Sequence, residues 1–394
     1  MKVMYHHKTR CSGADGTHIK GIVDGFKSLG YQVDVISYAG CNVDFESKKL
    51  SDKDKRIATK MPRILFEMLE VLYNIPAILR LVVYQIRNKY DIVYERYALL
   101  SMVGCFISIF FRKPLFLEVN FTTRSEIYPK RTGVFRFLES FLEHLIFKRA
   151  AIIYVISDHL KHDILSHGID KEKILVLPNA VDIEHFKPME SDKKILDKYG
   201  ITKKDRIIGW VGCFAPWHGL DLLLDSFKLL LEKNKDVKVM LIGGGQTYQV
   251  IKQRIKEEHL DERAIFTGRV LYDVLPAYIN MFDIAVVPDA AAYTSPVKMF
   301  EYMAMQKPVV GPRLKNIKLV ISDGQEGILF NRKDAEGLKN ALINLLSDSE
   351  LSTKMGAAGR KKVSNNHTWR KNVEKIIDFY NSITDVSSLK IENI

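Results

Sequence analysis

Residues 287–311, VPDAAAYTSPVKMFEYMAMQKPVVG, contain the pattern that decides the fold. A short apolar strand runs into a loop, and Ser295 followed by Pro296 is typical of a helix start with serine as the N-cap. The helix predicted over 297–305 buries one apolar stripe, and a second strand over 308–311 follows directly. This strand–loop–helix–strand order predicts an α/β domain.

The start of this predicted helix has the features of an anion site. The first backbone N–H groups of a helix have no partner within it, and the helix dipole is positive at that end. Lys298 adds a positive charge at the positive end of the dipole, which is unfavourable by itself. A bound anion such as phosphate would offset this repulsion. The alternative is a packed helix on which Lys298 and Glu301 form a solvated pair at i, i+3. The segment alone leaves both interpretations open.

The run Ser-Pro-x-Lys-x-Phe-Glu-Tyr-Met-Ala, from Ser295 to Ala304, resembles the nucleotide-sugar loop of the family 4 glycosyltransferases, which have the GT-B fold. The resemblance implies that the loop amides contact the diphosphate and sugar of the donor and that Glu301 holds the ribose hydroxyls. Many members have a second glutamate eight residues earlier, where this sequence has Tyr293. The resemblance makes Lys298 a catalytic cation and assigns these donor contacts: Thr294, Ser295, Pro296, Val297, Met299 and Glu301.

The chain opens with a strand over 2–7, a loop with Gly13 and Gly16, a helix over 17–29 and a strand over 31–37. This order is typical of the start of a doubly wound parallel sheet. The glycines either form a structural turn or let the backbone approach a ligand, and the spacing leaves both open. In the resembling family a glycine-rich loop here lies against the donor, which makes Gly16 a candidate donor contact.

Polar residues gather at the carboxyl end of the strand predicted over 114–126. The carboxyl ends of the strands are where α/β sheets place their ligands. The resemblance makes Asn120 and Glu126 candidates for contacts with the donor sugar or the acceptor, so we group both with Lys298 as catalytic candidates. The alternative is a polar strand end without a function.

Two apolar segments and the charge of the N-terminal half bear on membrane association. The amphipathic segment 63–89 should kink at Pro76, and its apolar stripe faces either the sheet, which we favour, or an anionic bilayer. The apolar run 98–111 is too short to span a bilayer and is interpreted as a buried helix.

Residues 1–150 hold 24 basic and 15 acidic side chains, which accounts for nine of the chain's +12 net charge. This excess favours an anionic membrane surface as a partner, and no segment has the pattern of a nucleic-acid-binding module.

The Pro-Asn-Ala-Val-Asp run that starts at Pro178 resembles the family's P-N-G-V-D-x-x-x-F stretch, which leads out of the first domain. Asp182 and Phe186 match, and an alanine replaces the usual glycine. We therefore expect a Rossmann-like first domain, a Rossmann-like second domain, and a crossing helix with its tail, over residues 1–188, 189–366 and 367–394.

The second domain repeats the alternation of strands and helices. The strand over 206–212 leads into a loop that resembles the family's phosphate-binding G-R-x-x-x-x-K-G, but Cys213 stands in the arginine's place and His218 in the lysine's. The resemblance adds these donor-binding candidates: Gly212, Phe214, His218, Gly244 and Arg269. Neutralisation of a diphosphate then depends on Lys298 and the helix start, with His218 or Arg269 as further cations.

The resemblance as a whole implies the GT-B fold: two Rossmann-like, doubly wound domains facing a cleft, and a C-terminal helix that crosses back to the first domain. It implies a retaining transfer of a sugar from a nucleotide diphosphate sugar to a glycan acceptor, without a metal or other cofactor. The Asp-Lys-Asp of 52–54 lies in a charge run and is given no metal role. Two alternatives remain: a catalytically inactive GT-B subunit that binds a partner, and a nucleotide-sugar epimerase, which would not need the Ser-Pro-x-Lys-x-Phe-Glu block.

The start of the chain and its cysteines bear on where it works. The first ten residues lack the apolar core of a signal peptide, and the four cysteines have neither metal nor redox spacing. With the basic N-terminal half, this predicts a cytoplasmic protein, peripheral on the inner face of the cell membrane. We expect a lipid-linked acceptor and a role in surface polysaccharide synthesis, such as lipopolysaccharide or capsule.

Overall fold

The computed structural model describes residues 1–9, 13–37, 62–125, 135–232, 234 and 236–391. Glu126 and the Asp-Lys-Asp of 52–54 lie outside the described residues. The chain divides into two compact units, the first made of Met1–Pro178 with Trp369–Ile394 and the second of Asn179–Thr368. This division falls before the predicted boundary at residue 188, because the segment after Pro178 packs within the second unit, where Phe186 is fully buried.

The first unit is built on a six-stranded sheet in the order β2-β1-β3-β4-β5-β6, with every pairing parallel. Its strands are β1 (Lys2–His7), β2 (Gln32–Ser37), β3 (Ile92–Arg96), β4 (Leu115–Val119), β5 (Ile152–Val155) and β6 (Ile174–Val176). Its helices are α1 (Ala14–Ser28), α3 (Arg63–Leu72), α4 (Asn74–Asn88), α5 (Val103–Phe110), α6 (Arg136–Arg149), α7 (Asp158–Leu165), the single-turn η2 (Lys171–Lys173) and α16 (Trp369–Ile391). The strand order reverses between β1 and β3, so their carboxyl ends are the expected place for a ligand.

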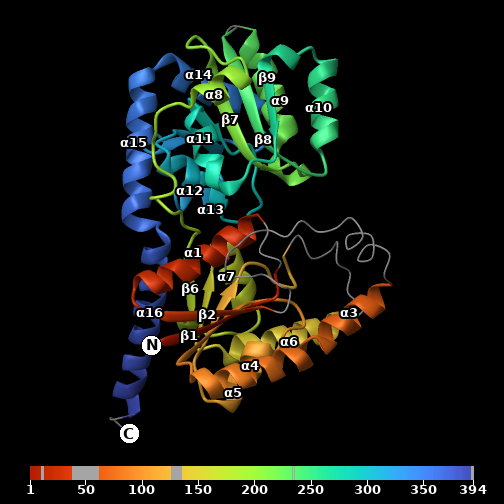
Figure 1. Ribbon diagram of the computed structural model, residues 1–394, viewed down its shortest axis with the longest axis vertical. Helices are drawn as coiled ribbons and strands as arrows, with labels where there is room; N and C mark the ends of the chain where they lie inside the picture. The colour runs from red at the N-terminus through yellow and green to blue at the C-terminus, as the bar shows by residue number, and fades with distance from the viewer. Residues whose placement is uncertain (10–12, 38–61, 126–134, 233, 235, 392–394) are drawn as a thin grey trace. The chain divides into compact units, whose positions relative to one another are not determined.

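The C-terminal helix α16 belongs to the first unit, as predicted, and packs against α1 (Figure 1). Two glycines of α1 allow this contact, because a Cβ on Gly21 or Gly25 would lie 2.2 Å or 2.7 Å from atoms of Trp369. Helix α1 begins at Ala14, before the predicted start, so Gly16 lies in its first turn and not in the loop.

The amphipathic segment forms two helices instead of one kinked helix. α3 ends at Leu72 and α4 begins at Asn74, because Pro76 has no N–H to donate to the Leu72 carbonyl and its ring clashes with that carbonyl. The predicted burial of the apolar stripe is wrong, since Ile75 is 60 % exposed and Leu79 is 63 % exposed. Helix α5, also predicted to be buried, exposes Phe106, Ile109 and Phe110.

The second unit has a six-stranded parallel sheet in the order β12-β11-β10-β7-β8-β9. Its strands are β7 (Arg206–Cys213), β8 (Val237–Gly244), β9 (Ala264–Gly268), β10 (Ile284–Val286), β11 (Val309–Pro312) and β12 (Gly327–Phe330). Its helices are α8 (Lys193–Lys198), α9 (Leu220–Leu231), α10 (Tyr248–Glu257), α11 (Leu275–Asn280), α12 (Val297–Ala304), α13 (Lys315–Lys318), α14 (Ala335–Ser347) and α15 (Ser349–Asn366), with single turns η3 (Pro216–His218), η4 (Asp261–Arg263) and η5 (Tyr272–Val274). Here the order reverses between β7 and β10, which makes the carboxyl ends of these two strands the expected ligand position.

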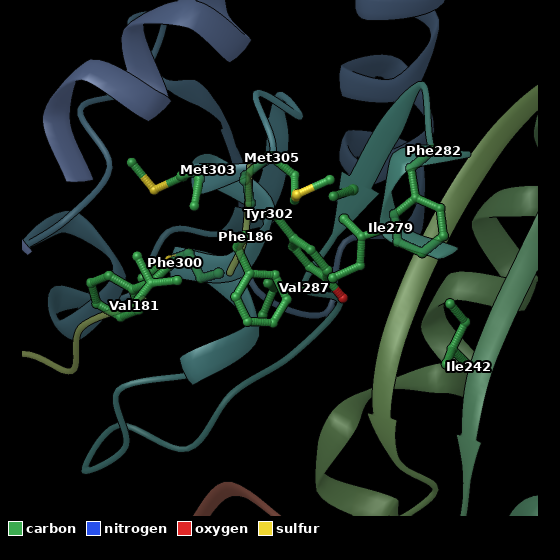
Figure 2. Close-up of a cluster of buried hydrophobic side chains, with 14 of the residues drawn as sticks. Val181, Phe186, Ile242, Ile279, Phe282, Val287, Phe300, Tyr302, Met303 and Met305 are labelled. Carbon is green, nitrogen blue, oxygen red and sulfur yellow. The ribbon is translucent and has the colours of Figure 1, made fainter. Parts of the chain in front are cut away.

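Helix α12 supplies much of the core of the second unit. Phe300, Tyr302 and Met303 are fully buried, and Figure 2 shows them in one apolar cluster with Phe186. Burial of side chains of this size stabilises the fold by about 1.5–3 kcal/mol each. The Tyr302 hydroxyl also accepts a hydrogen bond from the Val211 N–H of β7 at 2.7 Å. Core packing and this bond together fix α12 beside the end of β7.

Candidate functional site

A cluster of side chains lies where β7 and α12 meet, at the point of strand reversal. Lys298, in the first turn of α12, places its Nζ 4.5 Å from the centre of the Trp210 ring of β7. The His218 ring, from η3, lies 5.9 Å from the same tryptophan ring, centre to centre. A cation over an aromatic face is weakly stabilised, so Trp210 holds Lys298 without giving it a hydrogen-bond acceptor.

The Lys298 ammonium is buried without a hydrogen-bond partner. Burial lowers the pKa of Lys298 to about 7, although Glu301 and Cys213 act in the opposite direction. A shielded amino group without an acceptor is costly to the fold. The predicted alternative of a solvated Lys–Glu pair is therefore wrong, and an anionic ligand would supply the missing partner.

Two buried titratable groups of the cluster, His218 and Glu301, add no positive charge to that of Lys298. Burial, reinforced by Lys298, lowers the pKa of His218 to about 3, so the imidazole is neutral at physiological pH. His218 therefore does not replace the positive charge of the lysine that the resembling family has in this place. Burial raises the pKa of Glu301 to about 7, although Lys298 lowers it. Arg269 is exposed, and its Cγ lies 3.5 Å from where a Cβ on Gly244 would be.

The loop before α12 is tied to two asparagines from elsewhere in the unit. Asn316 donates from Nδ2 to the carbonyl of Thr294 at 2.7 Å. The N–H of Asn179 donates to Oγ of Ser295 at 3.0 Å, and its Nδ2 donates to the Ser295 carbonyl at 2.6 Å. Ser295 is therefore not the predicted N-cap. Pro296 takes that place and offers no side-chain cap, so the first N–H groups of α12 remain available to a ligand.

Glycines at the ends of β7 and β8 leave space that a side chain would fill, beside Lys298 at Gly212 and beside Arg269 at Gly244. A Cβ on Gly212 would lie 2.6 Å from Nζ of Lys298, so any side chain there would displace the ammonium. The Phe214 N–H donates to the Gly244 carbonyl at 3.3 Å, which joins the two strand ends. The side chains of Phe214 and Met299 are fully buried, so only their backbone groups can contact a donor.

The remaining predicted site residues lie in the first unit or next to the loop. Gly16 is buried in the first turn of α1, and Asn120 follows β4, where its Nδ2 donates to the Glu118 carboxylate. Tyr293, which replaces the second glutamate, is buried.

Several side chains that build this site were not identified from the sequence. Trp210 has the pattern of an ordinary core residue in an apolar strand, and Asn316 and Asn179 are far from the loop in sequence. Only the folded arrangement shows that all three act on the start of α12 or the loop before it.

In the described part of the chain, no group of three or more histidine, cysteine, aspartate or glutamate side chains is placed to hold a metal ion. Nor does any of its helices combine the length and apolarity needed to cross a membrane.

Two family profiles match the chain, one in each half. The profile described as glycosyltransferase family 4 matches residues 16–185, and the profile described as glycosyl transferases group 1 matches residues 191–362. The first match runs from the start of α1 through the first sheet and ends shortly after Pro178. The second match includes β7, α12 and the cluster around Lys298.

The chain also resembles individual proteins. The capsular polysaccharide biosynthesis glycosyltransferase CapM of Staphylococcus aureus is 23 % identical over 378 residues, which cover 94 % of this chain and 95 % of CapM. The GDP-mannose-dependent alpha-(1-6)-phosphatidylinositol monomannoside mannosyltransferase of Mycolicibacterium smegmatis is 24 % identical over 201 residues, 49 % of this chain and 52 % of that enzyme. The crystal structure of Anabaena HepE in complex with UDP-glucose matches with a TM-score of 0.72 and 17 % identity, over 97 % of this chain and 100 % of that one.

Proposed function

The chain is a glycosyltransferase of family 4 with the GT-B fold, and on that basis we propose that it moves a sugar from a nucleotide diphosphate sugar to a lipid-linked glycan acceptor with retention of configuration. No metal takes part in the proposed reaction. The product contributes to a surface polysaccharide, and the enzyme works on the inner face of the cell membrane.

The observation that carries the donor part of the proposal is the buried, unpartnered ammonium of Lys298 at the start of α12. A diphosphate at this position would pair with the ammonium and accept hydrogen bonds from the first N–H groups of the helix. Glu301, one turn further along, would accept hydrogen bonds from the ribose hydroxyls. The site therefore suits the nucleotide and phosphates of the donor.

These groups would also act in the chemical step. The bond from C1 of the sugar to the diphosphate oxygen breaks, negative charge builds on the diphosphate, and fixed positive groups there lower the barrier. In the proposed front-face reaction the acceptor oxygen bonds to C1 on the side the diphosphate leaves. Its proton passes to the departing phosphate oxygen, so that no enzyme base is needed. Lys298 and the helix start stabilise the leaving group, and neutral His218 does not.

Relatives support the general class of substrates. HepE is a structural neighbour with UDP-glucose bound, and the mycobacterial relative is named as dependent on GDP-mannose and as acting on a phosphatidylinositol mannoside. CapM, which the chain matches over nearly its full length, is named for capsular polysaccharide biosynthesis. A nucleotide sugar as donor and a growing surface glycan as acceptor are consistent with all three names.

The apolar surface of the first unit supports the membrane part of the proposal. We define this surface as the exposed large apolar side chains of α3, α4, α5 and α6: Ile64, Leu65, Met68, Leu69, Leu72, Ile75, Leu79, Val83, Ile86, Phe106, Ile109, Phe110, Phe137 and Phe141. The helices are linked within the unit, because the Phe135 N–H before α6 bonds to Glu67 of α3, and Arg149 at its end bonds to the Ser108 carbonyl of α5. Exposed apolar surface on this scale marks an interaction site.

The first half of helix α6 has the inverse of the usual amphipathic pattern, whereas Ile146 and Phe147 in its second half are buried in the usual way. Glu139 and Glu143 are buried, whereas Phe137 is 87 % exposed and Phe141 is also exposed. Burial raises the pKa of Glu139 to about 7, with Glu67 and Glu70 acting in the same direction. Carboxylates turned inward leave aromatic rings and basic groups outward, which suits an anionic bilayer. The basic groups on these helices or at their ends include Arg80, Arg87, Lys89, Arg112, Lys113, Arg136 and Lys148.

A panel of UDP-, GDP- and TDP-sugars in a thermal-shift experiment tests the donor part first. A donor that binds only the folded state raises the melting temperature, and we expect one nucleotide to do so. Nucleotide release and sugar transfer to lipid extracts then test the reaction. If no nucleotide sugar binds, the chain is an inactive subunit, and if the donor is only converted to an isomeric nucleotide sugar, the chain is an epimerase.

Flotation with anionic vesicles tests the membrane part. We expect binding that weakens as salt rises, because exposed charges are screened. Leu79→Glu on the apolar surface should abolish flotation. Val250→Glu, at an exposed apolar position on α10 of the second unit, is the matched control and should not.

A further inference from the structure

A hollow lies at the amino edge of the first sheet, opposite to the edge where parallel sheets bind their substrates. It has a volume of about 630 Å³ and lies between the starts of β1 and β2 and the end of α4. Its walls carry three basic side chains, Lys2, Arg87 and Lys89, and one acidic side chain, Asp91. Because of its position, a ligand bound in the hollow would not take part in the sugar transfer.

Helix α4 runs antiparallel to the strands, so its last turn reaches this edge of the sheet. At the start of α4, the Tyr73 hydroxyl lies 3.1 Å from Nε2 of His6, near the carboxyl end of β1. At the end of α4, Nζ of Lys2 donates to the Asn88 carbonyl at 3.2 Å. These two contacts hold the last turn of α4 beside the start of β1, which brings the basic side chains of both elements to one hollow.

The hollow carries more positive than negative charge. Arg87 and Lys89 are exposed, and within the residues that the structure describes neither forms an ion pair. The ammonium of Lys2 bonds to a neutral carbonyl, and the Asp91 carboxylate accepts the backbone N–H of Lys2 at 2.8 Å. The negative end of the α4 dipole attracts cations, but it is equivalent to only about half a charge. Three cations against one carboxylate therefore favour an anionic ligand.

Exposed apolar side chains border the hollow. Ile86 directly precedes Arg87 in the last turn of α4 and is 62 % exposed, and Val83, one turn earlier, is also exposed. An anionic phospholipid matches both features, since its phosphate needs cations and its acyl chains need an apolar surface. A soluble phosphate or a nucleic acid would leave the apolar side chains uncovered. The combination therefore favours a lipid.

We propose that the hollow binds the phosphate of an anionic phospholipid, with Arg87 and Lys89 as its cationic contacts and the acyl chains along the exposed side chains of α4. The site makes membrane binding selective for lipids of net negative charge, and it fixes which edge of the first sheet meets the lipid headgroups. The inference rests on the membrane part of the proposed function and is independent of the donor and of the transfer reaction.

The test titrates dihexanoyl phosphatidylglycerol, kept below the concentration at which it forms micelles, into the full chain in a calorimeter. Monomeric lipid has no surface potential, so it reports on a binding site and not on the general attraction of a basic protein to a charged membrane. We expect saturation at one lipid per chain. Dihexanoyl phosphatidylcholine, whose choline neutralises the phosphate charge, should bind roughly tenfold more weakly. Absence of saturable binding of the phosphatidylglycerol overturns the inference.

Two pairs of variants with the same change in charge locate the site. Arg87→Gln with Lys89→Gln should weaken binding tenfold or more, roughly the effect of losing a charge-assisted contact to the phosphate. Arg112→Gln with Lys148→Gln removes two exposed cations of the same unit that do not line the hollow, and should leave the affinity within about threefold of wild type. Equal losses in the two pairs would show that net charge is the cause, which overturns the site. Both pairs should keep the melting temperature within about 2 °C, because all four side chains are exposed.

Glycerol 1-phosphate separates a lipid site from a site for soluble phosphates. It carries a phosphate without acyl chains, and we expect it to bind roughly tenfold more weakly than the dihexanoyl lipid, because it covers none of the apolar side chains. Equal affinity for the two compounds would overturn the assignment to a lipid.

Flotation with anionic vesicles keeps a failure of this inference apart from a failure of the proposed function. If the chain floats and Leu79→Glu abolishes flotation, but monomeric lipid does not bind, the membrane proposal stands and the headgroup site is refuted. If monomeric lipid binds and the variant pair at Arg87 and Lys89 prevents it, but the chain does not float, the headgroup site stands and the membrane proposal fails.

Discussion

Replacing Lys298 with methionine removes the buried ammonium at the start of α12 while it keeps most of the side chain's length. Nζ has no hydrogen-bond partner in the ligand-free chain. The wild-type lysine therefore weakens the fold, and its benefit appears only when an anion is bound. We expect Lys298→Met to be more stable than the wild type and worse at binding the donor.

The magnitude follows from the pKa of Lys298, which burial lowers from 10.5 to about 7. One pKa unit corresponds to about 1.4 kcal/mol, which sets an upper limit of about 5 kcal/mol on the cost of the charged group. Because about 1 kcal/mol moves the melting temperature of a unit of this size by roughly 2–4 °C, we expect a gain of several degrees. Loss of a charge-assisted contact to the diphosphate, about 1.5–3 kcal/mol, should weaken donor binding roughly 10- to 150-fold.

The pH dependence identifies the ammonium as the cause. The unfolded chain keeps the proton of Lys298 up to about pH 10.5 and the folded chain only up to about pH 7. The destabilisation is therefore complete below pH 7 and disappears as the pH rises from 7 to 10.5. The difference in melting temperature between Lys298→Met and wild type should be largest below pH 7 and shrink above it.

The matched control is Lys307→Met. Burial also lowers the pKa of Lys307, to about 8, but its Nζ donates a hydrogen bond to the Asn280 carbonyl at 2.8 Å. This variant should keep donor affinity and gain less stability than Lys298→Met, because its pKa is lowered less and it also loses the hydrogen bond to the Asn280 carbonyl. If Lys298→Met loses stability, the ammonium has a partner in the free chain. An unchanged dissociation constant for the donor would show that the diphosphate does not bind there.

Four further predictions follow from the same contacts. Glu301→Ala should raise the donor KM about 10- to 100-fold in steady-state kinetics, because the ribose hydroxyls lose a charged acceptor; an unchanged KM would remove Glu301 from the donor site. Gly212→Ala should weaken donor binding in calorimetry, because its Cβ would lie 2.6 Å from Nζ of Lys298; wild-type affinity would contradict the close contact. Leu79→Glu should abolish vesicle flotation and leave the melting temperature within about 2 °C, since the residue is exposed; persistent flotation would refute the membrane assignment of the apolar surface. Glu139→Gln should stabilise the chain at pH 8, because burial raises the pKa of Glu139 to about 7. Between pH 7 and 4.5 the folded state keeps a proton on Glu139 that the unfolded state loses, so the gain should fade over this range. A gain that does not vary with pH would show that the carboxyl is not the cause.

The strand–loop–helix–strand pattern around α12 could be predicted from the sequence because alternating apolar runs and turn residues are local signals. The resemblance at Ser295–Ala304 extended this to the whole fold, which the two parallel sheets and the family profiles confirm. The N-cap was mispredicted by one residue, because the competing partner of the Ser295 hydroxyl is Asn179, which is distant in sequence.

Burial in the first unit could not be predicted from the sequence. The stripe of α3 and α4 has the period of a core-facing helix, and the same period also fits a helix that turns its apolar face outward. Which face packs depends on the partners, and α6 shows this most clearly, with Glu139 and Glu143 inside and Phe137 outside. The neutral state of His218 depends in the same way on burial and on nearby Lys298.

The central claim, that the donor diphosphate binds at the start of α12, is tested most directly by a crystal structure of the chain with the nucleoside diphosphate that stabilises it most. The account predicts phosphate oxygens within hydrogen-bonding distance of Nζ of Lys298 and of the first N–H groups of α12. A diphosphate bound elsewhere, with Lys298 still over the Trp210 ring and without a phosphate partner, would contradict it.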